Sequence, residues 1–260
     1  MNFLQKLERA ITATNSLLCV GLDPDGEKIG KTYSQFSFNK KIIDETADLV
    51  CCYKPQIAFY AASGIKGLKD LKKTISYIQE KYPQIPIILD AKRSDVAPTS
   101  EKYTEEVFNW LSVDAVTVNP YLGFDSLKPF FERKEKGIIV LCRTSNPGAC
   151  DFQDLKVKGV PLYLTVAQKI VEWDKKYHNL LMVVGATWPN QLGEVRQVAP
   201  KLTFLVPGIG PQGGDLKKTL NYGLRRDKKG LIISASRSII YSSDPRISAQ
   251  KLRDEINKHR

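Results

Sequence analysis

The sequence has very few histidines and lacks the motifs that mark most metal-dependent or nucleotide-cofactor enzymes. His178 and His259 are the only two histidines in 260 residues, and neither ends a predicted strand. A Ser-His-Asp or Cys-His catalytic arrangement is therefore not expected. No Cys, His and carboxylate cluster has metal-ligand spacing, and no G-x-G-x-x-G follows the first predicted strand. We expect neither a metal nor a cofactor, so the chemistry falls to lysines and carboxylates.

Long apolar runs and a cysteine framework are also missing. No segment approaches the roughly 18 apolar residues that a membrane span needs, and charges interrupt the N-terminal segment where a signal peptide would be apolar. Apolar residues near the N-terminus recur at helical spacing, at Phe3, Leu4, Leu7 and Ile11. This spacing predicts a short amphipathic helix. The five cysteines form no C-x-x-C pair, and all except Cys150 lie in or beside predicted strands. We expect reduced thiols, no membrane association and a cytoplasmic location.

Acidic residues are scarce relative to basic ones. The chain has 28 Asp and Glu against 39 Lys and Arg, which gives a net charge of +11. Such an excess could attract nucleic acid or an anionic metabolite. The basic residues are scattered, in segments such as KKIIDE and RRDKKG, without the interleaved aromatics of a single-strand-binding surface. We expect a lysine-rich solvated surface and no nucleic-acid partner. The nucleic-acid alternative predicts a steep salt dependence of binding.

What the sequence has throughout is alternation of strand-like and helix-like segments. The continuous apolar runs of strand length are 17–23, 49–55, 85–92, 114–120, 137–144, 180–187, 202–208 and 230–237. The helical segments between them include 37–49, 68–82, 99–111 and 161–177. Eight such units predict an α/β fold, a (β/α)8 TIM barrel forming a single domain over 1–260 after the short N-terminal helix. An open doubly wound sheet is the alternative. Segment 144–161 is expected to be an irregular loop on the catalytic side.

Nearly every predicted strand ends in a polar residue. These residues are Asp23, Lys54, Asp90 with Lys92, Asn119, Ser145, Thr187, Gln212 and Arg237. In a barrel, the carboxyl ends of the strands form one rim, which is where catalytic groups sit. We therefore expect these side chains to converge on one site.

The segment DAKRSDVAPT, residues 90–99, carries the densest set of charges on this rim. Because side chains alternate along a strand, Asp90 and Lys92 should share a face. Lys54 should stand beside Asp90, from one strand over. An aspartate flanked by two ammonium groups has a lowered pKa and stays ionised. A structural ladder of salt bridges is the alternative reading, although a buried ion pair gains little stability after desolvation.

The segment PGIGPQGGD, residues 207–215, predicts an anion site. Its glycines would let backbone N–H groups approach a phosphate closely. Arg237, which ends the next predicted strand, offers a planar fork for phosphate oxygens. The loops after the seventh and eighth strands of a barrel commonly hold a phosphate.

The motifs together resemble those of the orotidine 5'-phosphate decarboxylases. DAKRSDVAPT fits the family signature D-x-K-x-x-D-[IV]-x-x-T, and the D-A-K-R form resembles the longer bacterial-type subgroup. The other matching segments, in chain order, are CVGLDPD, YKPQIAFY, VTVNPYLG, TSNPG, PGIGPQGGD and SASRS. The resemblance spans the whole chain. It implies a homodimer of barrels that converts orotidine 5'-monophosphate to UMP and CO2 in pyrimidine biosynthesis, without metal or cofactor.

The resemblance also implies the catalytic roles of four residues. Lys92 would be the general acid that protonates C6 of the pyrimidine as CO2 leaves. Asp90 would lie next to the substrate carboxylate, and Lys54 and Asp95 would complete a network of alternating charges.

The remaining positions would bind the nucleotide or shape its site. They are Asp23 and Lys54 at the ribose, Ser145 at the pyrimidine, Gln212 between base and phosphate, Arg237 at the phosphate, Asn119 at the rim, and Gly213 and Gly214 in a closing loop. Asp95 and Thr99 would reach across the dimer interface to the partner's ribose.

The chain departs from many relatives at Ser94, Val96 and Ala97, where they carry Gly, Ile and Gly. Ser94 or Ala97 would be strained if its position required a positive φ. Pro98 removes a backbone donor. These changes leave the chemistry intact but bear on the inter-subunit loop.

Two other enzyme classes remain possible on sequence grounds. Sugar-phosphate decarboxylases and hexulose-phosphate synthases are similar in their D-x-K-x-x-D core but bind magnesium through an acidic residue at the end of the second strand. Lys54 occupies that position here, which argues against a metal. A class I aldolase would use Lys92 or Lys54 as a Schiff base.

Overall fold

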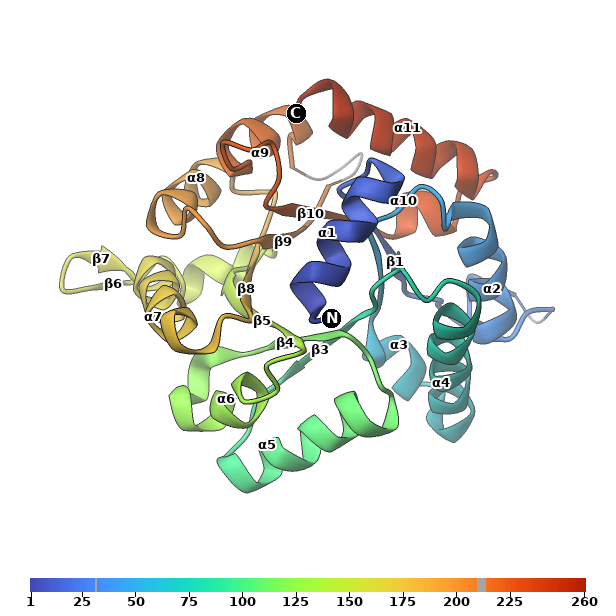
Figure 1. Cartoon of the computed structure of the whole chain (residues 1–260), viewed down its shortest axis with the longest axis horizontal. Helices are drawn as coiled ribbons and strands as arrows, with labels where there is room; N and C mark the ends of the chain where they lie inside the picture. Colours follow the sequence, from blue (N-terminus) through green and yellow to red (C-terminus); the bar gives the residue numbers. More distant parts are fainter. Residues whose placement is uncertain (31, 210–213) are drawn as a thin grey trace.

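The computed structural model describes residues 1–30, 32–209 and 214–260, and its centre is a barrel of eight parallel strands (Figure 1). The strands follow the order β2-β1-β10-β9-β8-β5-β4-β3. The two outer strands meet through bridges that pair Tyr53 with Ile87 and Gln56 with Asp90. These bridges close the sheet, so the predicted TIM barrel is confirmed and the open doubly wound sheet is wrong.

Each predicted apolar run corresponds to one barrel strand, and β3 extends one residue beyond its run, to Arg93. The bounds are β1 Leu18–Leu22, β2 Cys52–Pro55, β3 Ile88–Arg93, β4 Ala115–Val118, β5 Gly137–Arg143, β8 Leu180–Val184, β9 Phe204–Pro207 and β10 Leu231–Ala235. Most of their side chains are buried, because helices cover the outside and the strands fill the interior with their own side chains. The strand sequences are therefore continuously apolar.

Helices surround the barrel (Figure 1). Their bounds are α1 Phe3–Thr14, α2 Gln35–Thr46, α3 Ile57–Ala61, α4 Gly64–Lys81, α5 Ala97–Thr104, α6 Phe124–Phe131, α7 Leu162–Tyr177, α8 Pro189–Val198, α9 Leu216–Gly223, α10 Arg237–Ile240 and α11 Pro245–Lys258. A π-helical turn, η1 Glu105–Trp110, continues α5, and short 3-10 turns form η2 Pro120–Leu122 and η3 Pro147–Asp151. The four predicted helical segments correspond to α2, α4, α5 with η1, and α7.

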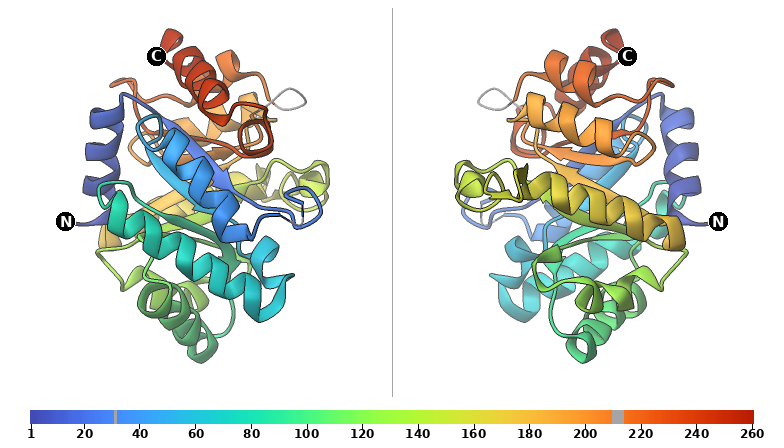
Figure 2. Two further views of the ribbon diagram at one scale, coloured as in Figure 1. Left: turned by 90° about the vertical axis from the view of Figure 1, so that its right-hand side faces the viewer. Right: turned by 90° about the vertical axis from the view of Figure 1, so that its left-hand side faces the viewer.

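Helix α1 covers the end of the barrel at which the strands begin (Figure 2). Its N-terminus is fixed by a capping box between Asn2 and Gln5, and its buried face includes Phe3 and Leu7. A Cβ on Gly137, the first residue of β5, would lie 2.2 Å from the Phe3 ring. This strand therefore has to begin with glycine for the helix to pack, and the predicted amphipathic helix is confirmed.

The segment after β5 is more ordered than the sequence predicts. Residues 144–161 were expected to form an irregular loop, but they contain η3 and an antiparallel hairpin of β6 Lys156–Val157 and β7 Val160–Pro161. The fully buried Arg143 at the end of β5 anchors the segment, because its guanidinium lies 3.0 Å from the Asp154 carboxylate and stacks on the Trp188 ring. Figure 2 shows this segment and α1 at opposite ends of the molecule.

The cysteines follow the sequence prediction. Cys19, Cys51, Cys52 and Cys142 are buried, Cys150 is exposed, and all five are free thiols. Among the helices that the structure describes, none is both long enough and apolar enough to cross a bilayer.

Candidate active site

The carboxyl ends of the barrel strands surround a cavity of about 410 Å³. Its lining residues are Lys54, Asp90, Lys92, Thr117, Leu141, Thr144, Ser145, Asn146, Gln153, Val183, Leu205 and Pro207. Four of them are predicted site residues: Lys54, Asp90, Lys92 and Ser145. The convergence of polar strand ends is therefore confirmed for these four.

Lys54, Asp90 and Lys92 form a continuous row of charges on one wall of the cavity. The Lys54 Nζ lies 3.2 Å from Asp90 Oδ2, and the Lys92 Nζ lies 2.7 Å from Asp90 Oδ1. The side chains of Lys54 and Asp90 are 7% and 13% exposed, whereas that of Lys92 is 45% exposed. One buried carboxylate is thus held between two ammonium groups, and the more accessible ammonium borders the cavity.

This arrangement shifts the pKa values of the two buried groups. Burial by itself would raise the pKa of Asp90, but the charges of Lys54 and Lys92 outweigh it and hold that pKa well below its usual range. Burial would likewise lower the pKa of Lys54, yet the carboxylates of Asp90 and Asp23 raise it above its ordinary value. Both groups are therefore charged at neutral pH, as the sequence predicts.

The backbone brings Asp90 and Lys92 together by a route that the sequence does not reveal. The sequence predicts regular alternation of side chains along this strand, but β3 contains a bulge. Leu89 pairs with Val116 of β4, and the next pair is Arg93 with Val118. Lys92 has a φ of 49°, in the left-handed region. Holding a residue other than glycine there costs about 1 kcal/mol or more, and such strain is concentrated at functional sites.

The departures in the following loop cause no strain. Neither Ser94 nor Ala97 has a positive φ. Pro98 lies in the first turn of α5, where a backbone N–H would have no partner within the helix. Segment 94–98 therefore accommodates Ser94, Ala97 and Pro98.

A second wall of the cavity is neutral and comes from the segment after β5. The Thr144 N–H donates to Gln153 Oε1 at 2.8 Å, and Gln153 Nε2 donates to Thr144 Oγ1 at 2.9 Å. Thr144 Oγ1 then donates to Asn146 Oδ1 at 2.7 Å. Because the Asn146 oxygen is already an acceptor, its amide N–H groups remain as donors for a ligand.

Ser145 is held against the segment that follows β8. Thr187, which follows β8, donates from its hydroxyl to the Ser145 carbonyl at 3.0 Å. A Cβ on Gly185 would lie 2.6 Å from the Ser145 Cα. These contacts fix the Ser145 backbone at the cavity edge.

Asp23 lies outside the cavity lining but close to its charges. It follows β1, and its charge contributes to the raised pKa of Lys54. Its buried Oδ1 has no hydrogen-bond partner among the described residues. A buried acceptor without a partner is costly, so a ligand donor would satisfy this oxygen.

The predicted phosphate site is described only in part. Arg237 begins α10, separated by one residue from the end of β10, and it is exposed. The Gly214 N–H donates to the Gly208 carbonyl at 2.8 Å, and a Cβ at residue 214 would lie 2.0 Å from the Ala186 carbonyl oxygen. Only glycine fits there. Gln212 and Gly213 lie outside the described residues.

Besides Asp23, Gly214 and Arg237, the predicted site residues Asp95, Thr99 and Asn119 do not line the cavity of this chain. The Asp95 carboxylate accepts the Val96 N–H at 2.7 Å, and Thr99 lies in the first turn of α5. The Asn119 side chain accepts from the Tyr121 N–H and caps η2. Asn119 therefore has a structural role in this chain, at the end of β4.

Sequence reasoning missed Thr117, Thr144, Asn146 and Gln153 as cavity residues. Thr144 and Asn146 flank the predicted Ser145 in the TSNPG motif, so their position next to Ser145 could have predicted that they line the cavity. Thr117 lies inside an apolar strand and Gln153 inside a segment expected to be irregular, and neither position has a local pattern that marks it.

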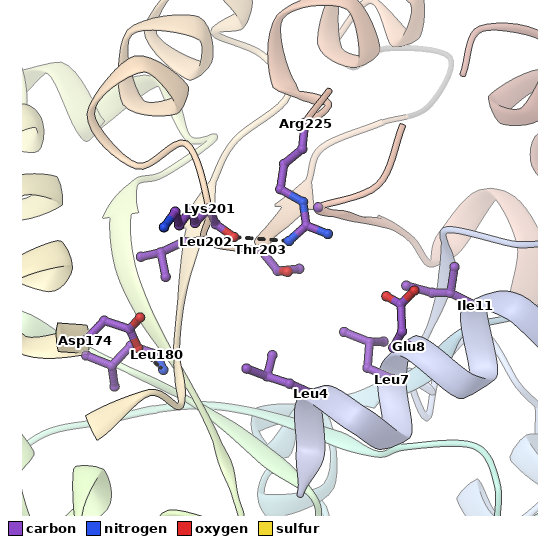
Figure 3. Close-up of a pocket in the computed structure, with 11 residues that line it drawn as sticks. Leu4, Leu7, Glu8, Ile11, Asp174, Leu180, Lys201, Leu202, Thr203 and Arg225 are labelled. Atoms are coloured by element: carbon purple, nitrogen blue, oxygen red, sulfur yellow. Dashed lines mark hydrogen bonds between the residues drawn. The ribbon is translucent and has the colours of Figure 1, made fainter. Parts of the chain in front are cut away.

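A second cavity, of about 200 Å³, lies beneath α1 at the opposite end of the barrel (Figure 3). Leu4, Leu7 and Ile11 of α1 form one side of it. Arg225 donates to the Lys201 carbonyl at its edge. This cavity contains none of the predicted site residues.

Within the described ranges, no group of three or more His, Cys, Asp or Glu side chains could hold a metal ion.

Comparisons with known proteins assign the chain to a family. The model of the orotidine 5'-phosphate decarboxylase / HUMPS family matches residues 16–252. An orotidine 5'-phosphate decarboxylase of Cellvibrio japonicus is 49% identical over 271 residues, covering 99% of this chain and 98% of that protein.

Solved structures agree with this assignment. The OMP decarboxylase structure of Leishmania donovani has a TM-score of 0.91 at 39% identity and covers 99% of this chain and 98% of that one. The Leishmania donovani UMP synthase has a TM-score of 0.93 at 41% identity, and this chain spans 56% of its length. By sequence and by fold, the chain belongs to the orotidine 5'-phosphate decarboxylase / HUMPS family.

Proposed function

We propose that the protein decarboxylates orotidine 5'-monophosphate to UMP and CO2, using its own side chains without a metal or cofactor. The observation that carries this proposal is the row Lys54–Asp90–Lys92, with its accessible ammonium at the cavity. A positive charge held beside the reacting carbon stabilises a carbanion as it forms.

The reaction needs one proton donor and no redox step. The C6–carboxylate bond breaks, CO2 leaves, and the electron pair stays on C6 in the plane of the ring. The Lys92 ammonium then gives C6 a proton, which completes UMP. Since the Lys92 side chain is 45% exposed, water can return a proton to the amine after turnover.

Asp90 and Lys54 support this step. The Asp90 carboxylate fixes the Lys92 ammonium and lies where the substrate carboxylate would approach. Lys54 keeps Asp90 ionised from the other side, because the pKa of Asp90 is held down by both ammonium groups.

The rest of the nucleotide would extend from this row toward the last strands. Asp23, whose buried Oδ1 has no partner among the described residues, and Lys54 would bind ribose hydroxyls. Ser145 would contact the pyrimidine. Arg237 would hold the phosphate, and Gln212 with Gly213 and Gly214 would close over the base and phosphate.

The HUMPS branch of the family is the competing assignment. The position where we expect that branch to place an acidic magnesium ligand, at the end of β2, holds Lys54, whose ammonium lies 3.2 Å from Asp90. An ammonium group at that point would repel a divalent cation. This residue therefore favours the decarboxylase.

The deciding experiment is a spectrophotometric assay of orotidine 5'-monophosphate decarboxylation. Protein treated with EDTA should turn over at an undiminished rate, and added Mg²⁺ should change nothing. Activity on a sugar phosphate that appears only with Mg²⁺ would support the HUMPS branch instead. Trapping of substrate by borohydride would support a Schiff-base aldolase.

We further propose that the chain works as a homodimer, with Asp95 and Thr99 acting in the partner's site. Neither residue lines the cavity of its own chain. Large apolar side chains are exposed on the neighbouring elements: Val96 lies just before α5, Tyr121 and Leu122 lie in η2, and Phe124 begins α6. Helix α6 packs on α5. Exposed apolar clusters of this kind mark protein interfaces.

We also propose that residues 1–260 act as one catalytic domain in the cytoplasm. The five free thiols fit a reducing compartment.

A further inference from the structure

Thr117 is a buried residue of β4 whose hydroxyl uses its full hydrogen-bonding capacity on the charged wall. It accepts the backbone N–H of Ala91 at 3.0 Å and that of Lys92 at 2.9 Å, and it donates to Asp90 Oδ1 at 2.8 Å. A hydroxyl has one donor and two acceptor sites, so all three are filled. The residue is 1% exposed.

The register of the two strands explains why these bonds exist. Leu89 pairs with Val116, and the next pair is Arg93 with Val118, so residues 90–92 all face the single residue Thr117. In such a bulge the extra N–H groups lose their partners in the sheet. The Thr117 hydroxyl replaces those partners for Ala91 and Lys92.

The same hydroxyl is linked to both the backbone and the ammonium of Lys92, directly to the first and through Asp90 to the second. The Lys92 N–H donates to Thr117 Oγ1, Thr117 donates to Asp90 Oδ1, and the Lys92 Nζ lies 2.7 Å from that same oxygen. The result is a closed ring that joins the backbone of Lys92, with its φ of 49°, to its own ammonium.

We propose that Thr117 is a positioning residue for decarboxylation, which holds the bulged backbone of Lys92 and orients the Asp90 carboxylate so that the ammonium meets C6. This inference rests on the proposed function. Thr117 acts through Asp90 and Lys92. Its β-branched side chain restricts the rotamers open to the hydroxyl, which keeps it aimed at the bulge.

The other buried threonines among the described residues do not have this pattern. The hydroxyl of Thr74 in α4 donates to the Asp70 carbonyl four residues earlier and accepts from Asn39 Nδ2 at 3.2 Å, and neither partner belongs to the charged wall. Thr74→Val is therefore a matched control for the loss of a buried hydroxyl.

The test compares Thr117→Val, Thr117→Ser and Thr74→Val in decarboxylation kinetics and in UMP binding. Thr117→Val keeps the shape of the side chain but removes the hydroxyl that donates to Asp90 and accepts two backbone N–H groups. It should lower kcat about a hundredfold, which is the effect expected when a catalytic group is misplaced by roughly 1 Å. UMP lacks the departing carboxylate, so its affinity should change by less than about threefold. Thr117→Ser should recover kcat to within about fivefold of the wild type. Thr74→Val should lower Tm and leave kcat unchanged.

Three results would overturn the proposal: a Thr117→Val enzyme with kcat within about threefold of the wild type, a UMP affinity that falls in step with kcat, or a serine variant no better than valine. If Thr117→Val does not fold, Thr117→Cys replaces it, because a thiol keeps only a weak donor and acceptor. The kcat of Thr117→Cys should lie below that of Thr117→Ser but above zero. Failure of the proposed function is seen separately, as a wild-type protein that does not decarboxylate orotidine 5'-monophosphate.

Discussion

The two ends of the barrel are built from the same eight strands but differ in how deeply their charged pairs are buried. At the carboxyl end, Lys54 and Asp90 are nearly buried and bonded to each other beside the larger cavity. At the amino end, the apolar side chains Leu4, Leu7 and Ile11 of α1 lie over a smaller cavity (Figure 3). Glu8 of the same helix pairs with Lys229 at the surface.

The difference separates function from stability. Burying charged groups costs desolvation energy that their attraction only partly offsets, so a row of buried charges is a poor way to stabilise a fold. An apolar helix face is an effective way. We therefore expect changes at the carboxyl end to alter catalysis first, and changes at the amino end to alter stability alone.

The largest effect is expected for Lys92→Ala. Removing the proton donor and its charge should lower kcat by about a thousandfold or more, while UMP still binds and the protein still folds. Lys128→Ala, at an exposed lysine of α6, is the control and should keep full activity. An alanine variant that retained substantial activity would show that the role assigned to Lys92 is wrong.

Asp90→Asn should reduce both activity and stability. It leaves the buried Lys54 without its main partner, which costs about 3 kcal/mol of unfolding free energy. The folded pKa of Asp90 lies below its unfolded value of about 3.9, so its stabilisation is present above pH ~4 and is lost as the pH falls through the folded pKa. Urea unfolding should therefore show a wild-type advantage at pH 7 that shrinks below pH ~4.

Asp44→Asn is the matched control for that experiment. Burial would raise the pKa of Asp44, but hydrogen bonds from Lys40, Lys81 and two tyrosines hold it below its usual range, on the outer surface of α2. This variant should also lose stability at neutral pH, with decarboxylation unchanged. If Asp44→Asn lost as much activity as Asp90→Asn, charged groups on the outer surface would matter for catalysis as much as those at the barrel rim, which contradicts our expectation.

Gln153→Leu tests the neutral wall and should have a moderate effect. It removes the hydrogen bonds between the Gln153 amide and Thr144 and frees the orientation of Asn146. Because this wall would contact the base equally in the ground state and the transition state, KM should rise about tenfold with kcat nearly unchanged. Gln79→Leu, whose amide bonds the Ser112 carbonyl far from the cavity, should alter neither constant.

The smallest effect on activity is expected at the amino end. Leu7→Ala enlarges the cavity beneath α1 and should lower the free energy of unfolding by about 2–4 kcal/mol. The kcat at 25 °C should stay at the wild-type value. A fall in kcat of more than about threefold would mean that the two ends are coupled.

The sequence by itself determined the barrel and the identity of its charged rim. Parallel strands covered by helices have to be apolar on both faces, so the eight runs are visible without a structure. Polar residues at the ends of those runs then reach one rim, because all the strands point the same way. Lys54, Asp90, Lys92 and Ser145 could be placed for that reason.

Only the tertiary structure decided how those residues are held. The bulge at 90–92, the three bonds of Thr117 and the exchange between Gln153 and Thr144 depend on the register of segments that lie apart in the chain. Register is set by packing between strands and by loop geometry, and no local pattern in β4 or in 144–161 encodes it. The side chains that carry the charge were therefore readable from the sequence, whereas the neutral side chains that aim them were not.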